Sequence, residues 1–495
     1  MTEQEATPII GIDLGTTNSL VAVPSRQGPV IVANERGERM TPSVVAVHPG
    51  QVLVGELARS QAVLNHAVTV TLAKRAMGSR QIWRLQDEDW TPERVSAAIL
   101  TSLRRTAEDY LGVPVREAVI TVPAYFNDRQ RQATLQAGEA AGLTVVKLMN
   151  EPTAAALMYG LEHGADDRLL VFDLGGGTLD ITLIEIREHA FVVRQVGGAT
   201  DLGGSDFDAL LVEELREVFR QEHGLDLAAD PVARQQLVLQ AERAKRDLSS
   251  ALEARVMIPY VTITPAGPLH LDLPLTRARA ELLFTPLLDR IRAILAETLA
   301  AAGVAAGWVN TVIMVGGASR MPCVRRLLTE LLPPAVTVRQ DLNPEEIVAL
   351  GAGLLAGVLA GTYPEIPFRD VTAHDLGIED DAGELVTLIP RGTAYPVERL
   401  RVFTTTRDHE TAVTIHVLER GEPGAEPVTL AWFGLESLPP AQAGTLDIGV
   451  TFAIDGHGIL RVRAVEETSG VRAEIQVSRY GAGRAYEERE MMQEA

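Results

Sequence analysis

Apolar and amphipathic segments alternate along the first 361 residues. Apolar positions recur at helical spacing most clearly over 91–111, where Thr91 suits the N-cap and Pro92 suits the first helical position. Further helices are predicted over 127–141, 151–159 (ended by Gly160), 206–221, 231–250, 276–302 and 344–360. Short apolar runs predict strands over 44–47, 118–122, 144–148, 169–172 and 311–315. This alternation of strands and helices predicts an α/β architecture.

One pattern occurs twice in this region. The runs Gly11–Thr17 and Phe172–Thr178 each place Asp-Leu-Gly and a threonine-containing turn after an apolar strand, and each leads into a second apolar strand. The distance between the two runs is far longer than the 20–50 residues of a solenoid repeat. We therefore expect two duplicated lobes, one at about 1–165 together with 344–361, the other at about 166–343.

The pattern changes near Gly361. Residues 362–370 contain two prolines that oppose a helix, so we expect an interdomain linker there. Beyond it, short strand-like runs separated by turn residues predict an all-β domain over 371–479, of the sandwich kind. Its predicted strands are 385–389, 412–418, 446–454, 459–465 and 473–477. The charged tail 480–495 is too short for a stable isolated helix.

Composition narrows the classes of function. The chain has 66 acidic and 45 basic side chains and a formal net charge of −21, which disfavours nucleic acid as a partner. Cys323 is the only cysteine, so no intrachain disulfide is possible and a reducing compartment fits. Residues 1–8 do not resemble a signal peptide, and the longest apolar stretch, 347–361, is shorter than the ~20 residues of a membrane span. We expect a cytoplasmic protein without membrane partners.

The two glycine turns suggest phosphate chemistry. Such a turn directs several backbone N–H groups toward one point, and two turns from two lobes would hold a polyphosphate from both sides. Asp13 and Asp173 end the strands that enter these turns, and paired carboxylates suit a hydrated Mg²⁺ on phosphate oxygens. For either turn alone, a tight connection without a ligand is the alternative. The chain lacks a G-x-x-x-x-G-K-[ST] signature, which disfavours a Walker-type ATPase.

Four polar residues are candidates for phosphoryl transfer to water, which depends on positioning and charge stabilisation. Lys74 would stabilise charge on a γ-phosphate, although a lone lysine more often lies at the surface. Glu151 opens a predicted helix, where the helix dipole favours an acidic residue, so catalytic and structural roles are both open. Thr178 and Asp180 follow the second turn and would orient water.

Seven motifs together closely resemble the DnaK-type family of seventy-kilodalton heat-shock chaperones, within the actin/hexokinase-like ATPase superfamily. In chain order they are Gly11–Ser19, Val122–Asp128, Asn150–Ala156, Phe172–Thr178, Leu202–Asp208, Glu242–Lys245 with Leu248–Ser250, and Val315–Pro322. The resemblance implies an α/β, actin-like, two-lobed ATPase domain over 1–361, built from duplicated ribonuclease-H-like lobes and followed by the all-β sandwich. It also implies ATP/ADP and Mg²⁺ as cofactors, with K⁺ nearby.

The resemblance assigns a role to each matching position. Asp13 and Asp173 would hold Mg²⁺ through waters. The catalytic group would comprise Lys74, Glu151, Asp173, Thr178 and Asp180. The phosphate contacts would be Gly15, Thr16, Thr17, Asn18, Gly175, Gly176, Gly177, Gly203 and Gly204. The nucleoside contacts would be Glu242, Lys245, Arg246, Ser249, Gly316, Gly317, Arg320 and Glu345, the last standing where the family usually has aspartate. Pro123, Arg131 and Asp370 match an interdomain relay. A structural role is the alternative for Arg246, Pro123 and Glu345.

The β half resembles the family's peptide-binding sandwich less densely. Val413 and Ile415 would line an apolar peptide groove, with Phe403 nearby. Strand alternation places Val413, Ile415 and Val417 on one face, which fits a groove lining and a sandwich core equally.

The sequence departs from the family pattern at four places. The region between Gly78 and Thr91 is short, and the linker segment Ile366–Asp370 carries a proline and an arginine where the family has leucines. The acidic run Glu379–Asp381 stands where apolar residues usually arch over the peptide, and would favour basic peptide flanks. We expect no helical lid within 480–495, which predicts fast peptide dissociation.

The leading hypothesis is an ATP-dependent, lidless DnaK-like chaperone in which ATP binding and hydrolysis regulate the binding of unfolded or extended polypeptides. The resemblance also implies a J-domain co-chaperone and a nucleotide-exchange factor as partners. The alternative is a nucleotide-switched interaction module for one specialised protein partner. A sugar or small-molecule kinase on the same fold is a weaker third reading, because it should not carry the β sandwich.

Overall fold

The computed structural model describes residues 8–163, 166–265, 267–339, 341–380, 382–421 and 425–476. These residues form two compact units. The first contains the described residues up to Ala124 together with Gln136–Phe368, and the second contains Tyr125–Leu135 together with the described residues from Arg369 onward. The short strand β19 (Phe368–Arg369) spans the boundary between them. The boundaries predicted from the sequence at 361, 362–370 and 371–479 stay predictions.

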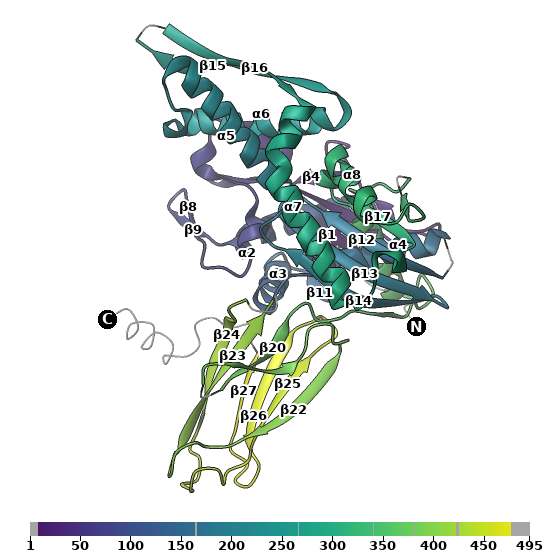
Figure 1. The fold of residues 1–495 in the computed structure, drawn as a ribbon, viewed down its shortest axis with the longest axis vertical. Coiled ribbons are helices and arrows are strands. Elements are labelled where there is room, and N and C mark those ends of the chain that lie inside the picture. The colour runs from purple at the N-terminus through teal and green to yellow at the C-terminus, as the bar shows by residue number, and fades with distance from the viewer. Residues whose placement is uncertain are drawn as a thin grey trace. The chain divides into compact units, whose positions relative to one another are not determined.

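The first unit contains two related sheets (Figure 1). The first has the order β11 (Thr144–Asn150), β10 (Glu117–Val122), β1 (Ile9–Asp13), β2 (Asn18–Val23) and β3 (Val30–Ile31), with β4 (Thr41–Pro42) also paired to β2. The second has the order β18 (Thr337–Arg339), β17 (Thr311–Val315), β12 (Asp167–Leu174), β13 (Leu179–Arg187), β14 (Ala190–Ala199) and the short β19. β1 is parallel to β10 and antiparallel to β2, and β12 is parallel to β17 and antiparallel to β13. This repeated arrangement confirms the duplicated lobes.

Two helices begin where the sequence predicts. In α2 (Pro92–Leu111), the hydroxyl oxygen of Thr91 accepts a hydrogen bond from the Arg94 N–H at 3.3 Å. In α3 (Asp128–Ala140), the side-chain oxygen of Asn127 accepts one from the Gln130 N–H at 3.0 Å. Side-chain acceptors of this kind satisfy N–H groups that the first helical turn leaves unpaired, so both predicted caps are confirmed.

Glycines allow the helices α4 (Glu151–His163) and α9 (Ile347–Leu359) to pack against neighbouring backbone. A Cβ on Gly351 would lie 2.0 Å from the Ala154 carbonyl oxygen, and one on Gly11 would lie 2.1 Å from the Gly353 nitrogen. The prediction that Gly160 ends α4 is wrong, because the helix continues to His163. A Cβ on Gly160 would lie 2.3 Å from the Phe191 ring, so this glycine makes room for packing and does not end the helix.

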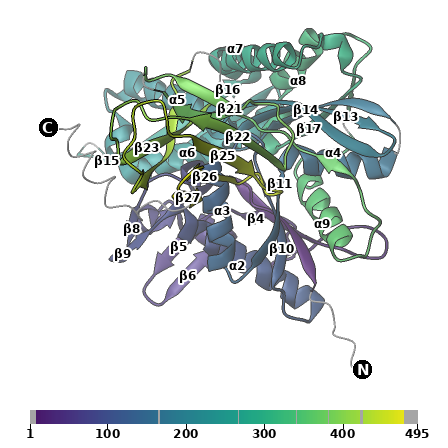
Figure 2. The same cartoon turned by 90° about the horizontal axis from the view of Figure 1, so that it is seen from below.

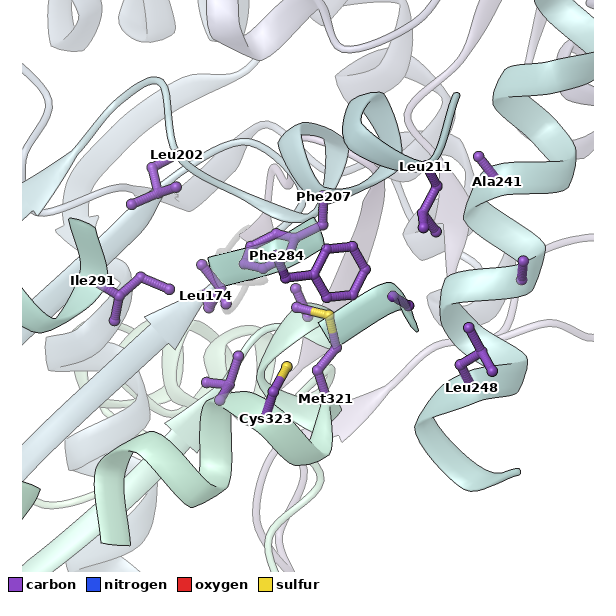
Figure 3. Packing of buried hydrophobic residues seen from close by; sticks show 14 of the residues in the cluster. Leu174, Leu202, Phe207, Leu211, Ala241, Leu248, Phe284, Ile291, Met321 and Cys323 are labelled. Carbon is purple, nitrogen blue, oxygen red and sulfur yellow. The ribbon is translucent and has the colours of Figure 1, made fainter. Parts of the chain in front are cut away.

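The second lobe adds helices around a large apolar core. They are α5 (Gly204–His223), α6 (Pro231–Ser250), α7 (Arg277–Ala301) and α8 (Pro322–Leu331). The hairpin of β15 (Glu253–Thr264) and β16 (Gly267–Thr276), which the sequence analysis does not predict, extends past α5 and α6 (Figure 1). In the core, the Phe207 and Phe284 rings meet edge to face with centroids 5.0 Å apart (Figure 3). Cys323 lies in this core, and burial raises the pKa of its thiol to about 11.

Smaller elements complete the first unit. They are β5 (Val45–His48), β6 (Gln51–Val54), α1 (Glu56–Gln61), β7 (Thr69–Val70), β8 (Trp83–Leu85) and β9 (Glu88–Trp90), with 3₁₀ turns at His66–Val68, Ala73–Ala76, Leu227–Ala229, Ala306–Trp308 and Gly317–Arg320. The short region between Gly78 and Thr91 forms the β8–β9 hairpin. Among the described residues, no helix combines the length and apolarity that crossing a membrane needs.

The second unit is a β sandwich, as the sequence predicts (Figure 2). One sheet has the order β21 (Leu385–Ile389), β20 (Asp375–Glu379), β23 (Ala412–Arg420) and β24 (Val428–Glu436), and the other has β22 (Val397–Phe403), β25 (Ile448–Ile454), β26 (Leu460–Glu466) and β27 (Arg472–Gln476). Inward-facing residues such as Ile389, Val417, Phe452 and Val462 are fully buried between the sheets. The predicted tail 480–495 and the expected lack of a lid lie outside the described residues.

Candidate functional site

The two glycine turns pack directly against each other in the first unit. A Cβ on Gly176 would lie 1.9 Å from the Thr17 hydroxyl oxygen, and one on Gly177 would lie 2.7 Å from the Thr16 methyl group. Within the first turn, a Cβ on Gly15 would lie 2.0 Å from the Asn18 carbonyl oxygen. The sequence separates these turns widely, and the duplicated strands β1 and β12 bring them together. Residues of both turns therefore lie at one place, and glycine turns of this kind are typical of anion-binding sites.

Carboxylates gather beside the two turns. Asp13 ends β1, and Asp173 lies near the end of β12, where it pairs in register with Asp180 of β13. Glu151 opens α4 and is 7% exposed, while Asp180 is fully buried. Burial and the neighbouring charge of Glu151 raise the pKa of Asp13 to about 7, and the same two causes raise the pKa of Asp173 well above its usual value. Several acids thus compete for too little compensating positive charge.

Lys74 is the basic group within this cluster. Its ammonium lies 2.5 Å from a carboxylate oxygen of Glu151, and both side chains are over nine-tenths buried. Lys74 belongs to the 3₁₀ turn Ala73–Ala76, which follows Leu72 in the left-handed region at φ 56°. The lysine is therefore not a solvated surface residue, the alternative that the sequence left open. Its charge lowers the pKa values of Asp13 and Asp173, but burial and the other carboxylates outweigh it.

This donor set fits a hard cation. Oxygen ligands and excess negative charge are what Mg²⁺ and K⁺ sites require, and Mg²⁺ commonly keeps several waters. No group of three or more His, Cys, Asp or Glu among the described residues is arranged to hold a metal directly. Burial and the neighbouring carboxylates raise the pKa values of Asp13 and Asp173, and a bound cation would favour the charged form of both groups.

The start of α5 meets the second turn. The N–H of Gly204 donates to the Gly175 carbonyl at 2.9 Å, and the N–H of Ser205 donates to the Gly176 carbonyl at 2.8 Å. A Cβ on Gly203 would lie 2.5 Å from the Gly177 nitrogen. Gly203 and Gly204 therefore lie at the second glycine turn, and a side chain on Gly203 would collide with the backbone of Gly177. Their role in phosphate binding stays a prediction.

Two of the four predicted nucleoside residues of α6 line a cavity of about 520 Å³. Glu242 and Arg246 contribute to its wall, and Arg246 is 61% exposed at its side chain. Lys245 and Ser249 do not line it. The Lys245 ammonium contacts Asp208 at 2.8 Å and the Gly204 carbonyl at 2.7 Å, and so joins α6 to the start of α5. The hydroxyl of Ser249 donates to the Lys245 carbonyl at 3.0 Å.

Gly316 and Gly317 follow β17 and lie close to Asp173 and to Glu345. Gly316 has φ +80°, and a Cβ there would lie 2.4 Å from the Leu174 carbonyl oxygen and 2.8 Å from an Asp173 carboxylate oxygen. The Arg320 guanidinium lies 3.3 Å from the Glu345 carboxylate. The structure therefore brings together four of the predicted nucleoside residues: Gly316, Gly317, Arg320 and Glu345.

The predicted peptide residues belong to the sandwich core of the second unit. Ile415 is 6% exposed and is part of the core cluster, and Phe403 and Val413 pack against it while half-buried. Ile415 pairs in register with Phe433, and Val413 with Leu435. Their role in peptide binding stays a prediction.

The acidic rim is only partly described. Glu379 contacts a ring nitrogen of His416 at 2.8 Å, while Asp380 accepts hydrogen bonds from the N–H groups of Ala382 and Glu384 and so forms a tight turn. Asp381 lies outside the described residues. Local structure thus explains Asp380 without a peptide.

The candidate relay residues are all buried. Pro123 and its neighbour Ala124 lie in the first unit. In the second unit, Arg131 is 5% exposed and donates to the Phe126 carbonyl at 3.2 Å, and Asp370 is 3% exposed. Their role in a relay stays a prediction.

Sequence reasoning missed two polar residues at the candidate site. The hydroxyl of Thr121, from β10, donates to an Asp13 carboxylate oxygen at 3.0 Å. Arg75, the neighbour of Lys74, reaches Ser205 and Asp206 at the start of α5. Thr121 lies within an apolar strand run that gives no sign of its partner, and the contacts of Arg75 join residues 130 positions apart.

Comparison with known proteins agrees with this geometry. The chain matches the family model of the Hsp70 protein over residues 9–83 and 82–495. It is 45% identical over 494 residues to the chaperone protein DnaK of Thermus thermophilus, which covers 94% of this chain and 80% of that protein. It is 44% identical over 488 residues to the chaperone protein DnaK of Halobacterium salinarum, which covers 98% and 77%. The chain therefore belongs to the Hsp70 family of molecular chaperones, which bind nucleotide and hydrolyse ATP.

Proposed function

We propose that the first unit binds ATP with its phosphates between the two glycine turns, and that hydrolysis there regulates the binding of extended polypeptide by the β sandwich. The observation that carries the proposal is the contact of the turns around Thr16, Thr17, Gly176 and Gly177 beside a buried cluster of carboxylates. Phosphate oxygens would accept from the turn N–H groups and from the threonine hydroxyls.

Asp13 and Asp173 would hold Mg²⁺ through waters, and the same acidic surroundings would accommodate K⁺. When bound, Mg²⁺ would offset the charge of the phosphate oxygens that face these acids. The protein's own contribution is to fix both carboxylates at strand ends, and Thr121 holds one oxygen of Asp13 in place.

Lys74 supplies positive charge where the terminal phosphate would lie. Glu151 holds the lysine ammonium at 2.5 Å and so orients it. Thr178 and Asp180, which follow the second turn in the chain and are both buried, would orient the attacking water. Such fixed donors stabilise developing charge without reorganisation during the reaction.

The nucleoside would extend from the turns toward α6 and the Gly316–Arg320 segment. Glu242, Lys245 and Ser249 would contact the ribose and adenine, and Arg246 and Arg320 would flank the adenine ring, as planar guanidinium groups can. Gly316 and Gly317 would let the nucleotide approach the backbone, and Glu345 would hold Arg320 at 3.3 Å.

In the second unit, Phe403, Val413 and Ile415 would contact an extended apolar peptide. Pro123, Arg131 and Asp370 would relay the nucleotide state to that site. A J-domain co-chaperone and a nucleotide-exchange factor would act on the cycle, and the protein would work in the cytoplasm.

Steady-state ATP hydrolysis, measured with and without an extended apolar peptide, tests this function. We expect measurable hydrolysis that depends on Mg²⁺ and a rate increase on adding peptide. Hydrolysis without peptide stimulation, together with tight binding of one protein partner, would instead favour a nucleotide-switched interaction module. Absence of hydrolysis would contradict the proposal.

A further inference from the structure

Arg75 stands beside Lys74 in the 3₁₀ turn Ala73–Ala76, but the two side chains have different partners. Lys74 contacts Glu151, whereas Arg75 contacts the start of α5 in the second lobe. We propose that Arg75 is a positioning residue for ATP hydrolysis: by clasping Ser205 and Asp206 it holds the second phosphate turn against the segment that carries Lys74. This inference rests on the proposed function, because it assumes that Lys74 acts on a bound nucleotide.

The clasp consists of several hydrogen bonds from one guanidinium. One of its nitrogens lies 2.8 Å from the Ser205 hydroxyl, and the other lies 3.1 Å and 3.3 Å from the two carboxylate oxygens of Asp206. Both members of the Arg75–Asp206 pair are 25% exposed at their side chains. A forked contact of this kind is stronger and more directional than a single point charge.

Asp206 also connects the clasp to the phosphate turn. Its second carboxylate oxygen accepts a hydrogen bond from the Gly203 N–H at 2.7 Å, so one side chain holds both Arg75 and the backbone at the start of α5. The next two N–H groups donate to the carbonyls of Gly175 and Gly176. A continuous set of hydrogen bonds therefore runs from Arg75 through α5 to the second glycine turn.

Packing reinforces the same connection. A Cβ on Gly177 would lie 2.9 Å from the Arg75 side-chain stem and 2.7 Å from Thr16. The stem thus lies against the second turn at the point where the first turn also meets it. Because Lys74 and Arg75 share a four-residue turn, loss of the clasp should loosen Lys74 as well as α5.

An ordinary half-exposed ion pair contributes little to the stability of the fold, because water screens its charges. The clasp differs because Arg75 joins two lobes, whereas a pair such as Arg104–Glu108 on α2 lies within one lobe. Arg84–Asp89, within the β8–β9 hairpin, is such an ordinary pair, with both side chains 62% exposed. Arg84→Ala is therefore the matched control.

Hydrogen exchange of the nucleotide-free protein tests the clasp without any nucleotide. In Arg75→Ala, we expect the amides of Gly203, Gly204 and Ser205 to exchange roughly tenfold faster than in the wild type, while Arg84→Ala leaves them unchanged. Arg75→Lys, which keeps the charge but not the fork, should fall between the two. Unchanged exchange in a folded Arg75→Ala would overturn the proposal, whether or not the protein binds ATP.

The second measurement combines single-turnover ATP hydrolysis with the release rate of a fluorescent ADP. We expect Arg75→Ala to release ADP about tenfold faster and to hydrolyse bound ATP about tenfold more slowly at saturating ATP, with partial rescue by Arg75→Lys. Asp206→Asn should show similar effects, and the double variant should show no more than either single variant, because partners in one contact are not additive.

The outcomes separate this proposal from the proposed function. If the wild type hydrolyses ATP and Lys74→Ala does not, but Arg75→Ala behaves like the wild type, the proposed function stands and the positioning role falls. Additive effects of Arg75→Ala and Asp206→Asn would also overturn it. If the wild type neither binds nor hydrolyses ATP, the proposed function fails, and the role of Arg75 in hydrolysis fails with it.

Discussion

The two units place their predicted functional residues in opposite kinds of surroundings. In the first unit, Asp13, Glu151 and Asp173 gather around one lysine, and burial together with mutual repulsion raises the pKa values of both aspartates. In the second unit, Val413 and Ile415 belong to an apolar core that any sandwich would need. Buried charges that oppose folding require a reason outside stability, whereas buried apolar residues do not. The first unit therefore indicates its function more strongly than the second.

Replacement of Lys74 gives the largest expected effect and tests the charged side of this comparison. We expect Lys74→Ala to lower single-turnover ATP hydrolysis by about 10²–10³-fold, the usual cost of losing one preorganised charge-stabilising group. ATP binding should change much less, as measured by calorimetry. Arg84→Ala is the control and should hydrolyse normally; hydrolysis by Lys74→Ala at the wild-type rate would contradict the role of the lysine.

Gly316 tests whether the close backbone approach beside Asp173 is required. An added methyl group would meet the Leu174 carbonyl at 2.4 Å at a φ of +80°, so we expect Gly316→Ala to lose about 2–4 kcal/mol of stability and to weaken ATP binding. Gly303 also has a positive φ, +65°, but an added methyl group there meets nothing within 4 Å. Gly303→Ala should therefore lower the free energy of unfolding by only about 1 kcal/mol. If denaturant unfolding shows equal losses for Gly316→Ala and Gly303→Ala, the positive φ alone matters and the close contact at Gly316 does not.

Glu419 is one of the buried charged residues of the second unit. Burial raises the pKa of its carboxyl to about 8, although Arg131 and Arg129 lower it, and His374 lies 3.9 Å away. Between pH 4.5 and 8 the folded chain thus retains a proton that the unfolded chain has lost, so stability falls as the pH rises. Asp128, whose pKa is raised to about 7, should add to this trend.

Glutamine at position 419 cannot titrate. Between pH 5 and 8.5 we therefore expect the free energy of unfolding of Glu419→Gln to fall by about 1–3 kcal/mol less than that of the wild type. Denaturant unfolding of the full chain, followed at the second unit by hydrogen exchange of β23, measures this difference. Parallel pH profiles for the two proteins would contradict the raised pKa of Glu419.

Val413 and Val417 give the smallest expected effect and test the apolar side of the comparison. Val417 is fully buried, so Val417→Ala should lower the free energy of unfolding by about 2 kcal/mol. Val413 is only half-buried, so Val413→Ala should lower it by less than about 1 kcal/mol. If Val413 lines a peptide groove, Val413→Ala should weaken binding of an extended apolar peptide several-fold in fluorescence anisotropy. An unchanged affinity would assign Val413 to the core alone.

The sequence predicts the features that depend on local patterns, but not those that depend on contacts between distant residues. Regular patterns predicted α2, α6 and β17 within about one residue, because apolar spacing and end caps are local properties. The end of α4 was wrong because Gly160 is read locally as a stop, whereas the Phe191 ring, from another element, explains it. The strand β22 was not predicted because the charged residues Glu398, Arg399 and Arg401 interrupt its apolar positions, so it contains no apolar run.

At the candidate site, motifs pointed to the residues that lie on the glycine turns and at strand ends. They missed Thr121 and Arg75, whose partners Asp13 and Asp206 lie more than 100 positions away. Contacts between side chains that belong to no motif cannot be predicted from the sequence and are found only in the folded structure. The same limit explains why alternation could not separate a groove from a core at Val413 and Ile415.

The most direct test of the central claim is a crystal structure of the chain with ADP and Mg²⁺. Our account predicts the β-phosphate between Thr16–Thr17 and Gly203–Gly204, with the ion beside Asp13 and Asp173 and joined to them through waters. A nucleotide bound elsewhere, or phosphates that do not contact both glycine turns, would contradict it.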